Sequence, residues 1–465
     1  MEFDFDQQGF NRCFDAQESF FDSGATLPRE FRLDSLVKLK KGLQRFEPRI
    51  LEALEGDLGK PSTEAFGSEI GFLYAELSHA IKHLRKWMKP RRVKTPFFLF
   101  PSKSKIVPSP KGTSLIIGPW NYPVHLLLAP LIGSIAAGKT ANLKPSELAP
   151  CSARLVQEII ESLFSPDFVA VFQGEGSQAI PAMMQARRFD HIFFTGSTRI
   201  GQSIAEQAAR QLVPVTLELG GKSPAIVDAN SQVKLAAKRI AWGKFFNSGQ
   251  TCVAPDYLVL HSSVREEFLA EMEKVLERFY GQERVSSPSL ARIVNLNHFR
   301  RLIGQLEDSR VLIGGRYDES LLRIEPTLVS ADREDHPLWS EEIFGPILPL
   351  VTFNDQSEIP GIVARHPNPL ALYLFSNDQK LHEKTIQKIP FGGGCINDVV
   401  AHLANPNLPF GGVGWSGTGR YHGKYSFDEF SHQKGIMTGS RRLDLPFRYP
   451  PYDEGKLKLF RRLLK

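Results

Sequence analysis

Between about residues 17 and 89, apolar side chains recur every three or four positions among mostly polar ones. This spacing places the apolar side chains on one face of a helix, so the N-terminal region is expected to be mainly helical. A Pro-rich stretch without acidic residues follows and reaches Pro110. Its prolines interrupt the helical periodicity and predict an extended excursion from the body of the protein. The helical spacing is carried by Leu36, Leu39 and Leu43 and by Leu77, Ile81 and Leu84.

Beyond Pro110, short apolar runs alternate with helix-length segments. Strands separated by helices in this way predict an α/β fold with parallel sheets and crossover helices. The longest weakly charged run, from Thr113 to Gly138, is interrupted by several Gly and Pro residues. We expect it to form a buried strand, a loop and a core helix rather than a membrane span. The predicted strands cover residues 114–118, 139–145, 168–174, 191–196, 213–221 and 224–228.

The length and composition exclude several classes of protein. A chain of 465 residues is long enough for two or more domains. With 42% hydrophobic and 23% charged residues, the disordered, collagen-like and low-complexity classes are excluded. The four cysteines are widely spaced and form no metal-binding pattern, so neither a disulfide framework nor a metal site is expected. The acidic, polar N-terminus differs from a signal peptide, and a cytoplasmic location is expected.

The net charge of +6 is concentrated in two segments of the chain. Residues 82–105 hold nine Lys or Arg and no acid, and residues 441–465 hold eight bases against three acids. The rest of the chain is therefore mildly acidic, and it contains no zinc-finger spacing or aromatic RNA-binding motif. A nucleic-acid partner is not expected.

Three polar residues stand out by their surroundings. Cys252 lies in a loop of small and polar residues, where a nucleophilic thiol would be accessible, although a lone cysteine is more often buried and inert. Glu218 ends an apolar strand and precedes two glycines, which either let a ligand approach closely or form a simple loop. Asn121 lies in a tight turn, where an Asn side chain usually bonds to its own backbone.

A helix start with two glycines follows the apolar run at residues 191–196. Gly196 to Gly201 opens a helix that continues through Arg210. Free amides at such a helix start suit a phosphate group, although a helix cap without a ligand is a common alternative. None of the predicted strands is followed by the dinucleotide fingerprint G-x-G-x-x-G, so this feature alone is a weak indication of a nucleotide site.

These residues belong to a series of motifs that closely resembles the aldehyde dehydrogenase superfamily. The motifs extend from about residue 30 to 440, in the family's order and at its intervals. The short N-terminus, NDVVAH (397–402) and RYHGKYSFDEFSH (420–432) resemble the class 3 branch, which includes fatty aldehyde dehydrogenases. The matching motifs are PWNYP (119–123), KPSE (144–147), FTGSTRIG (194–201), LELGGKSP (217–224), NSGQTC (247–252), EEIFGP (341–346) and PFGGVGWSGTGRYHGKYSFDEFSH (409–432).

The resemblance implies NAD(P)-dependent oxidation of an aldehyde to a carboxylic acid. Cys252 would attack the aldehyde carbon as a thiolate and give a thiohemiacetal. The side-chain amide of Asn121 and the backbone amide of Cys252 would hold the oxyanion. After hydride transfer to the nicotinamide, Glu218 would deprotonate the water that hydrolyses the remaining thioester.

The resemblance also assigns a cofactor site. Lys144 and Glu147 would hold the adenosine ribose hydroxyls, and Glu147 would repel a 2′-phosphate, which favours NAD and leaves NADP as a further cofactor. Glu342 and Phe344 would position the nicotinamide ribose. The other expected cofactor contacts are Ile117, Pro119, Trp120, Phe194, Thr195, Gly196, Ser197, Ile200, Gly201 and Leu219.

The family fold implies three structural parts and a tail. These are a Rossmann-like cofactor domain (1–81 and 106–220), an α/β catalytic domain (221–394), and a β oligomerisation arm with a segment that closes the substrate site (82–105 and 395–440). An exposed edge strand in the arm needs a partner, so a homodimer is expected. Residues 441–465 predict a basic amphipathic helix, docked either on the protein or peripherally on a membrane surface.

The substrate is the least determined part of the prediction. The class 3 resemblance and the basic tail favour medium- to long-chain aliphatic aldehydes, with aromatic and apocarotenoid aldehydes as alternatives. A non-catalytic structural or binding member of the family is a further alternative, but the presence of Cys252, Glu218 and Asn121 disfavours it. An enzyme that passes the acyl group to coenzyme A is disfavoured by Glu218, which suits hydrolysis.

Overall fold

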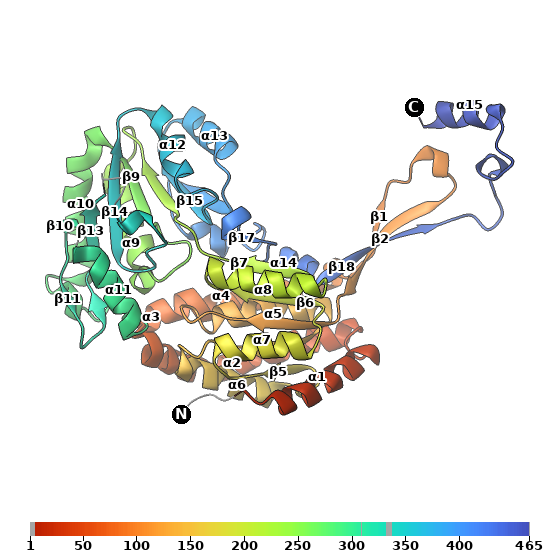
Figure 1. Cartoon of the computed structure of the whole chain (residues 1–465), viewed down its shortest axis with the longest axis horizontal. Coiled ribbons are helices and arrows are strands. Elements are labelled where there is room, and N and C mark those ends of the chain that lie inside the picture. Colours follow the sequence, from red (N-terminus) through yellow and green to blue (C-terminus); the bar gives the residue numbers. More distant parts are fainter. Residues whose placement is uncertain (1–4, 308, 332–336, 465) are drawn as a thin grey trace.

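The computed structural model describes residues 5–307, 309–331 and 337–464. Two α/β bodies lie next to each other, and a long arm projects from one of them and ends at the C-terminal helix (Figure 1). Among the described residues, no helix combines the length and the apolar character that crossing a membrane requires.

The N-terminal region is helical, as predicted. Its apolar face is buried, because Leu36, Leu39, Leu43, Leu77 and Leu84 are at most 1% exposed. A left-handed glycine, Gly59 with φ of 60°, ends the longest of its helices. The segments are α1 (Gln7–Asp22), α2 (Arg29–Leu58), α3 (Ser62–Ala65), the π-helix η1 (Phe66–Ile70) and α4 (Gly71–Trp87).

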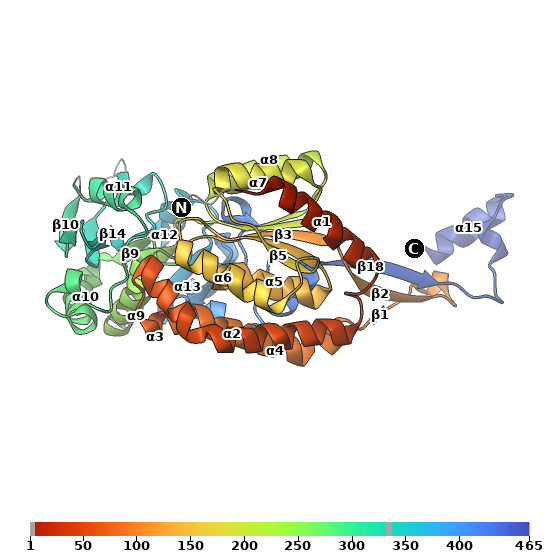
Figure 2. The ribbon, with the colours of Figure 1, turned by 90° about the horizontal axis from the view of Figure 1, so that it is seen from below.

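The first body contains a six-stranded sheet with the order β17-β7-β6-β3-β4-β5. Its strands are parallel except β17, which pairs antiparallel with β7. Figure 2 shows α7 (Gly176–Ala186) and α8 (Thr198–Arg210) on one side of this sheet and α2, α4 and α6 (Pro150–Leu163) on the other. The strands are β3 (Thr113–Ile117), β4 (Thr140–Lys144), β5 (Val169–Val171), β6 (His191–Thr195), β7 (Val215–Glu218) and β17 (Gly417–Thr418).

The strands and helices predicted around this sheet are confirmed. The run from Thr113 to Gly138 forms β3, a loop and the buried helix α5 (His125–Ala137). The helix predicted after the strand at 191–196 is α8, which ends at Arg210 as expected. Because the carboxyl ends of parallel strands meet at one edge, the residues that end β3, β4, β6 and β7 lie along a common edge of the sheet.

The second body contains a seven-stranded sheet with the order β10-β13-β14-β9-β8-β15-β16. Its strands are parallel except β10, at one edge. The strands are β8 (Pro224–Val227), β9 (Tyr257–His261), β10 (Arg310–Ile313), β13 (Thr327–Ser330), β14 (Ile347–Phe353), β15 (Ala371–Phe375) and β16 (Gly393–Ile396). The helices of this body are α9 (Val233–Phe245), α10 (Arg265–Tyr280), α11 (Leu296–Glu307), α12 (Ile359–Ala364) and α13 (Gln379–Lys388).

The arm is a three-stranded sheet with the order β1-β2-β18. Strands β1 (Arg91–Val93) and β2 (Lys103–Pro110) come from the first basic segment, and β18 (Ser431–Thr438) returns after α14 (Lys424–Glu429) to pair with β2. The extended arm begins later in the sequence than the basic segment does. Residues 82–87 still belong to α4, because Leu84 and Trp87 extend its buried face and Pro90 follows only after the helix has ended.

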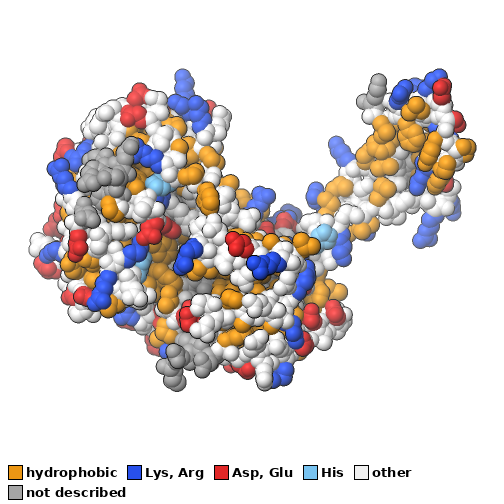
Figure 3. Space-filling model, viewed as in Figure 1, with side chains coloured by type: hydrophobic (Ala, Val, Ile, Leu, Met, Phe, Trp, Pro, Cys, Tyr) orange, Lys and Arg blue, Asp and Glu red, His pale blue; other side chains and the backbone are white. Residues whose placement is uncertain are grey.

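The C-terminal helix lies at the far end of the arm. α15 (Glu454–Leu463) lies beside the hairpin tip of the first basic segment, and within the C-terminal segment the rings of Phe447 and Phe460 are 5.5 Å apart. A cavity of about 670 Å³ between them is lined by Phe98, Phe100, Leu463 and neighbouring residues. The two basic segments, which are more than 330 residues apart in sequence, therefore meet at one projecting tip (Figure 3).

Candidate active site

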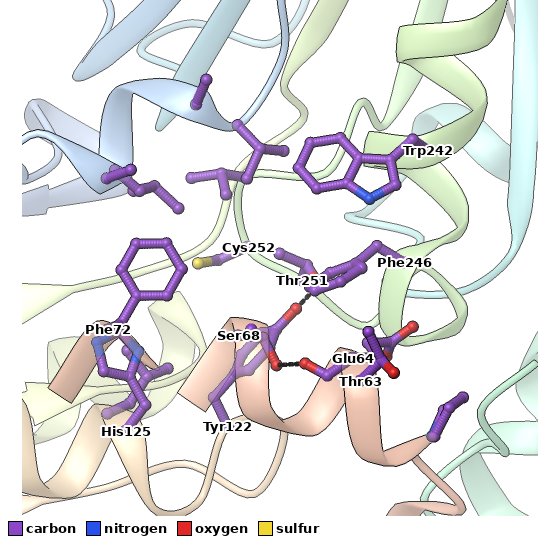
Figure 4. A pocket seen from close by; sticks show the side chains of 18 of the residues that line it. Thr63, Glu64, Ser68, Phe72, Tyr122, His125, Trp242, Phe246, Thr251 and Cys252 are labelled. Carbon is purple, nitrogen blue, oxygen red and sulfur yellow. Dashed lines mark hydrogen bonds between the residues drawn. The ribbon is translucent and has the colours of Figure 1, made fainter. Parts of the chain in front are cut away.

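A deep, mostly apolar cavity of about 860 Å³ lies where the two bodies meet, close to Cys252. Figure 4 shows Cys252 with Phe72 and His125 on one side and Thr251, Phe246 and Trp242 on the other. A cavity of this size suits an organic ligand held mainly by apolar contacts with a few polar groups. Its apolar walls consist of Phe72, Tyr122, Leu126, Trp242, Phe246, Val253, Phe279, Tyr280, Val400, Leu403, Phe410 and Tyr421.

A turn of unusual backbone conformation presents Cys252 to the cavity. Asn247, Ser248 and Gly249, just after α9, all have positive φ angles of 51° to 73°. A Cβ at Gly249 would lie 2.2 Å from the carbonyl oxygen of Gly345, so only glycine fits. Such backbone strain persists where the surroundings fix it, which is common at functional sites. The amide of the buried Gln250 fixes it here, because it donates to the carbonyl oxygens of Asn247 and Arg292, each at 3.0 Å.

The Cys252 thiol is half-buried and carries a strongly shifted pKa. Burial is the main cause, and the nearby carboxyls of Glu342 and Glu218 add to it; together they raise its pKa to about 12. The backbone N–H groups of Cys252 and Val253 point at the sulfur and act in the opposite direction, because they stabilise the thiolate. The thiol is therefore protonated at neutral pH until a base or an approaching electrophile changes its surroundings.

Asn121 and Glu218 converge on the same place from the first body. Asn121 is 3% exposed, and its side-chain Nδ2 donates to the carbonyl oxygen of Gln250 at 3.0 Å, two residues before Cys252. Glu218 ends β7, is 2% exposed, and neither of its carboxyl oxygens bonds to any described residue. Burial, and then the charge of Glu429, raise its pKa well above the usual value. A carboxyl with a raised pKa next to a thiol is typical of acid–base chemistry.

The predicted cofactor residues lie along the carboxyl edge of the six-stranded sheet. Ile117 and Lys144 end β3 and β4, and Phe194 and Thr195 end β6. Lys144 Nζ forms an ion pair with Glu147 at 3.1 Å, and Glu147 Oε1 accepts a hydrogen bond from Gly176 N. This edge is where open α/β sheets bind nucleotides.

The start of α8 offers an anion site beside this edge. Ser197 is the N-cap of α8 but makes no capping hydrogen bond through its side chain, so the first amides of the helix have no cap from that residue. Gly196 N donates to Glu218 O at 3.0 Å, and a Cβ at Gly201 would clash with Leu219. Ile200, in contrast, is 44% exposed on α8.

Glu342 and Phe344 come from the second body and reach the same region. Glu342 packs so closely on Gly220 that a Cβ there would lie 1.8 Å from a carboxyl oxygen. Burial, and then Asp256, raise the pKa of Glu342 to about 8. Phe344 has a φ of 52°, and its ring meets that of Trp120, which follows Pro119, at 5.3 Å.

The residues present fit a dinucleotide. Three features together form a polar cradle beside the thiol: a glycine that leaves room for a carboxyl, a helix start without a side-chain cap, and a Lys–Glu pair at the end of β4. No group of three His, Cys, Asp or Glu side chains suited to a metal occurs in the part of the chain that the structure describes.

Several residues of the site were not predicted from the sequence. Lys60, Glu64 and Glu69 lie between α2 and α4, in a region that the sequence showed only as helical. The Glu64 carboxyl lines the cavity and accepts a hydrogen bond from Asn247 N at 3.0 Å, and burial raises its pKa to about 7. No local motif marks these residues, because they reach the site only through tertiary packing.

Comparison with known proteins identifies relatives of this chain. Residues 4–436 match the model of the aldehyde dehydrogenase family. The 4,4′-diaponeurosporen-aldehyde dehydrogenase of Staphylococcus aureus is 46% identical over 450 residues, which are 96% of this chain and 97% of that protein. Aldehyde dehydrogenase family 3 member H1 of Arabidopsis thaliana is 42% identical and covers 96% of this chain and 92% of its own length.

Solved structures show the same fold. The substrate-bound state of Staphylococcus aureus AldH has a TM-score of 0.94 and 45% identity, with 98% of this chain and 99% of that chain covered. An NAD-dependent aldehyde dehydrogenase from Sinorhizobium meliloti has a TM-score of 0.85 and 26% identity, with 95% and 88% covered.

Proposed function

Because the chain belongs to the aldehyde dehydrogenase family, whose oxidoreductases use NAD or NADP, we propose that Cys252, Asn121 and Glu218 form its active site. The observation that supports this assignment is their convergence around Cys252, which lines the apolar cavity: Asn121 bonds to the carbonyl oxygen two residues before it, and the Glu218 carboxyl acts on its thiol. Bound NAD or NADP supplies the hydride acceptor for the oxidation. The cradle residues that hold it are Lys144, Glu147, Gly196, Ser197, Glu342 and Phe344, with the strand-end residues around them.

In the first half of the reaction, the Cys252 thiol gives its proton to solvent, its sulfur bonds to the aldehyde carbon, and the carbonyl oxygen becomes an oxyanion. The Asn121 amide and the backbone N–H of Cys252 donate to this oxygen. Loss of the hydride from the carbon then leaves a thioester on Cys252.

In the second half, Glu218 takes a proton from a water that attacks the thioester carbon. The carbon–sulfur bond breaks, the thiol of Cys252 is restored, and the carboxylic acid leaves. A carboxylate whose pKa is raised by burial is a stronger base near neutral pH than an exposed one. Its unbonded oxygens are available to the water, because no described residue competes for them.

The substrate proposed is a medium- to long-chain aliphatic aldehyde. The cavity beyond Cys252 is walled mainly by aromatic and aliphatic side chains, so each additional buried methylene group contributes about 0.8 kcal/mol to binding. An apocarotenoid aldehyde is a second candidate, because the Staphylococcus aureus relative carries the name of such an activity. Both substrates are long and apolar, whereas an aromatic aldehyde would fill only the part of the cavity nearest the thiol.

We expect decanal and hexadecanal to be oxidised with a kcat/KM at least about tenfold above that of benzaldehyde, because several more methylene groups are buried. Steady-state NADH formation over a panel with propanal, benzaldehyde, decanal, hexadecanal and retinal measures this. A matched variant, Gly67→Leu, narrows the cavity. Gly67 lies in the cavity wall, and a Cβ there would meet no atom within 4 Å, so the larger side chain can be added. It should slow hexadecanal more than propanal. Benzaldehyde oxidised as fast as decanal would refute the aliphatic assignment.

The arm supports a homodimer and contact with an anionic membrane surface. β18 leaves one edge unpaired, and Ile436 and Met437 on it are 41% and 54% exposed, so a second copy would complete the sheet. Phe97 and Tyr452, in the two segments that form the tip, are 83% and 71% exposed. Figure 3 shows hydrophobic side chains gathered at the tip with Lys and Arg side chains around them. Apolar side chains next to basic ones are typical of peripheral membrane contacts.

A chain ending at Tyr452 should remain dimeric but bind anionic vesicles at least about tenfold more weakly. It keeps β18 and loses α15 with its four described bases, each of which contributes about 1 kcal/mol near an anionic surface. Light scattering measures the dimer, and co-sedimentation with phosphatidylserine vesicles measures the binding. The matched control exchanges three of these bases for Gln: Lys458, Arg461 and Arg462. Because it removes charge and keeps the helix, it separates the effect of charge on vesicle binding from the effect of losing the helix. Equal vesicle binding by the intact and shortened chains would contradict the membrane contact.

A further inference from the structure

A fully buried ion pair lies directly behind Asn121. Lys60 and Glu69 are 1% and 0% exposed, and Lys60 Nζ lies 2.6 Å from Glu69 Oε1. Lys60 follows the left-handed Gly59 that ends α2, and Glu69 lies in the π-helix η1. Burying two charges is costly unless other hydrogen bonds satisfy them. Single π-helical turns often occur at functional sites.

The remaining hydrogen bonds of the pair all go to one turn. Lys60 Nζ donates to the carbonyl oxygen of Asn121 at 2.9 Å and lies 4.0 Å from the centre of the Tyr122 ring. Glu69 Oε2 accepts from the backbone N–H groups of Val124 and His125 at 3.0 and 3.2 Å. The cation therefore holds the start of the turn, and the carboxylate holds its end.

The other side of this turn faces the nucleophile. The carbonyl oxygen of Asn121 also accepts a hydrogen bond from Asn247 Nδ2 at 3.0 Å. The Tyr122 hydroxyl lies 2.5 Å from Thr251 Oγ1, next to Cys252. The backbone of Asn121 is thus fixed from both sides, and its side chain has one direction left in which to point, toward Gln250 O and the thiol.

We propose that Lys60 and Glu69 are positioning residues that hold the Asn121 amide in its orientation toward the oxyanion. Neither residue itself lines the cavity, and they act through the main chain of residues 121–125. An apolar pair could fill the same volume, but it could not bond to both ends of the turn. The inference rests on the oxyanion role proposed for Asn121, because a donor contributes to the rate only when it is preorganised.

The test compares the effect of one double substitution in the native protein with its effect in the Asn121→Ala variant. Lys60→Met with Glu69→Gln removes both charges together, so no lone charge is left buried, and the Gln carbonyl can still accept from Val124 N and His125 N. We expect this double exchange to lower kcat for decanal about tenfold or more, to change KM less than about threefold, and to leave the protein folded by circular dichroism. In the Asn121→Ala background, the same exchange should change kcat less than about twofold.

The outcomes separate the two proposals. Equal losses of kcat in both backgrounds, or no loss in the native background, would refute the positioning role alone. An unchanged kcat in Asn121→Ala would refute the oxyanion role and the positioning role with it. If the double exchange does not fold, Lys60→Met alone decides the question by the same comparison, because the Glu69 carboxyl can then take up a proton and still accept hydrogen bonds from the turn.

Discussion

Cys252→Ser lowers kcat for aldehyde oxidation by roughly 10⁴-fold or more, because a serine hydroxyl ionises far less readily than a thiol and attacks the aldehyde carbon much more slowly. Binding of NAD stays near the native value, since Cys252 lines the substrate cavity rather than the strand-end cradle. Fluorescence of NADH in the steady state measures the rate, and quenching of the protein's Trp fluorescence measures cofactor binding.

The other three cysteines are matched controls for this experiment. Cys13, Cys151 and Cys395 are half-buried free thiols like Cys252, and Cys395 has a histidine, His402, 3.6 Å from its sulfur. Each of them exchanged for Ser should leave kcat within about twofold of the native value. A Cys252→Ser enzyme that keeps more than about a tenth of the native rate, or a comparable loss in Cys395→Ser, would contradict the assignment of the nucleophile.

Glu218→Gln separates the two halves of the reaction. Formation of the thioester needs no base at this position, so one equivalent of NADH still appears rapidly with each active site. Hydrolysis of the thioester loses its general base, and the steady-state rate falls by about 10² to 10⁴-fold. Stopped-flow fluorescence resolves the burst and the slow phase. Steady turnover at the native rate, or loss of the burst itself, would refute the role of Glu218.

Glu429→Gln is the control for this variant. Glu429 raises the pKa of Glu218 and lies on α14, where it accepts a hydrogen bond from Thr216 Oγ1. Removing its charge lowers the pKa of Glu218, and the basic form of Glu218 is present above that pKa. The acidic limb of the pH profile for steady turnover should therefore move to lower pH, with a burst of native size.

Much of the active site could be predicted from the sequence because the residues that do the chemistry lie in short motifs on turns and strand ends. The runs at 191–196 and 213–221 are strands whose last residues are Thr195 and Glu218. The loop around Cys252 is a strained turn, consistent with its small and polar composition. In these places the local sequence determines the conformation, so the predicted strands agree with the structure.

The residues that hold the site in place could not be predicted in this way. Lys60 and Glu69 lie about 50 to 60 residues before Asn121 in the sequence, and they contact the turn at residues 121–125 only after α2 and α4 pack on α5. Glu69 lies on the buried face with Leu73 and Leu77, at helical spacing, but the sequence does not show which groups that buried carboxylate bonds to. Likewise, residues 82–87 belong to α4 although their charge groups them with the arm. Contacts made by tertiary packing leave no local pattern.

The proposed mechanism depends most on a covalent intermediate at Cys252. The most direct test is the mass of the Glu218→Gln protein after reaction with NAD and decanal. Without the general base, the decanoyl thioester should accumulate. Intact-protein mass spectrometry should show one added decanoyl group per chain, and peptide mapping should place it on Cys252. A protein that forms one equivalent of NADH but carries no acyl group, or carries it on another residue, would contradict the account.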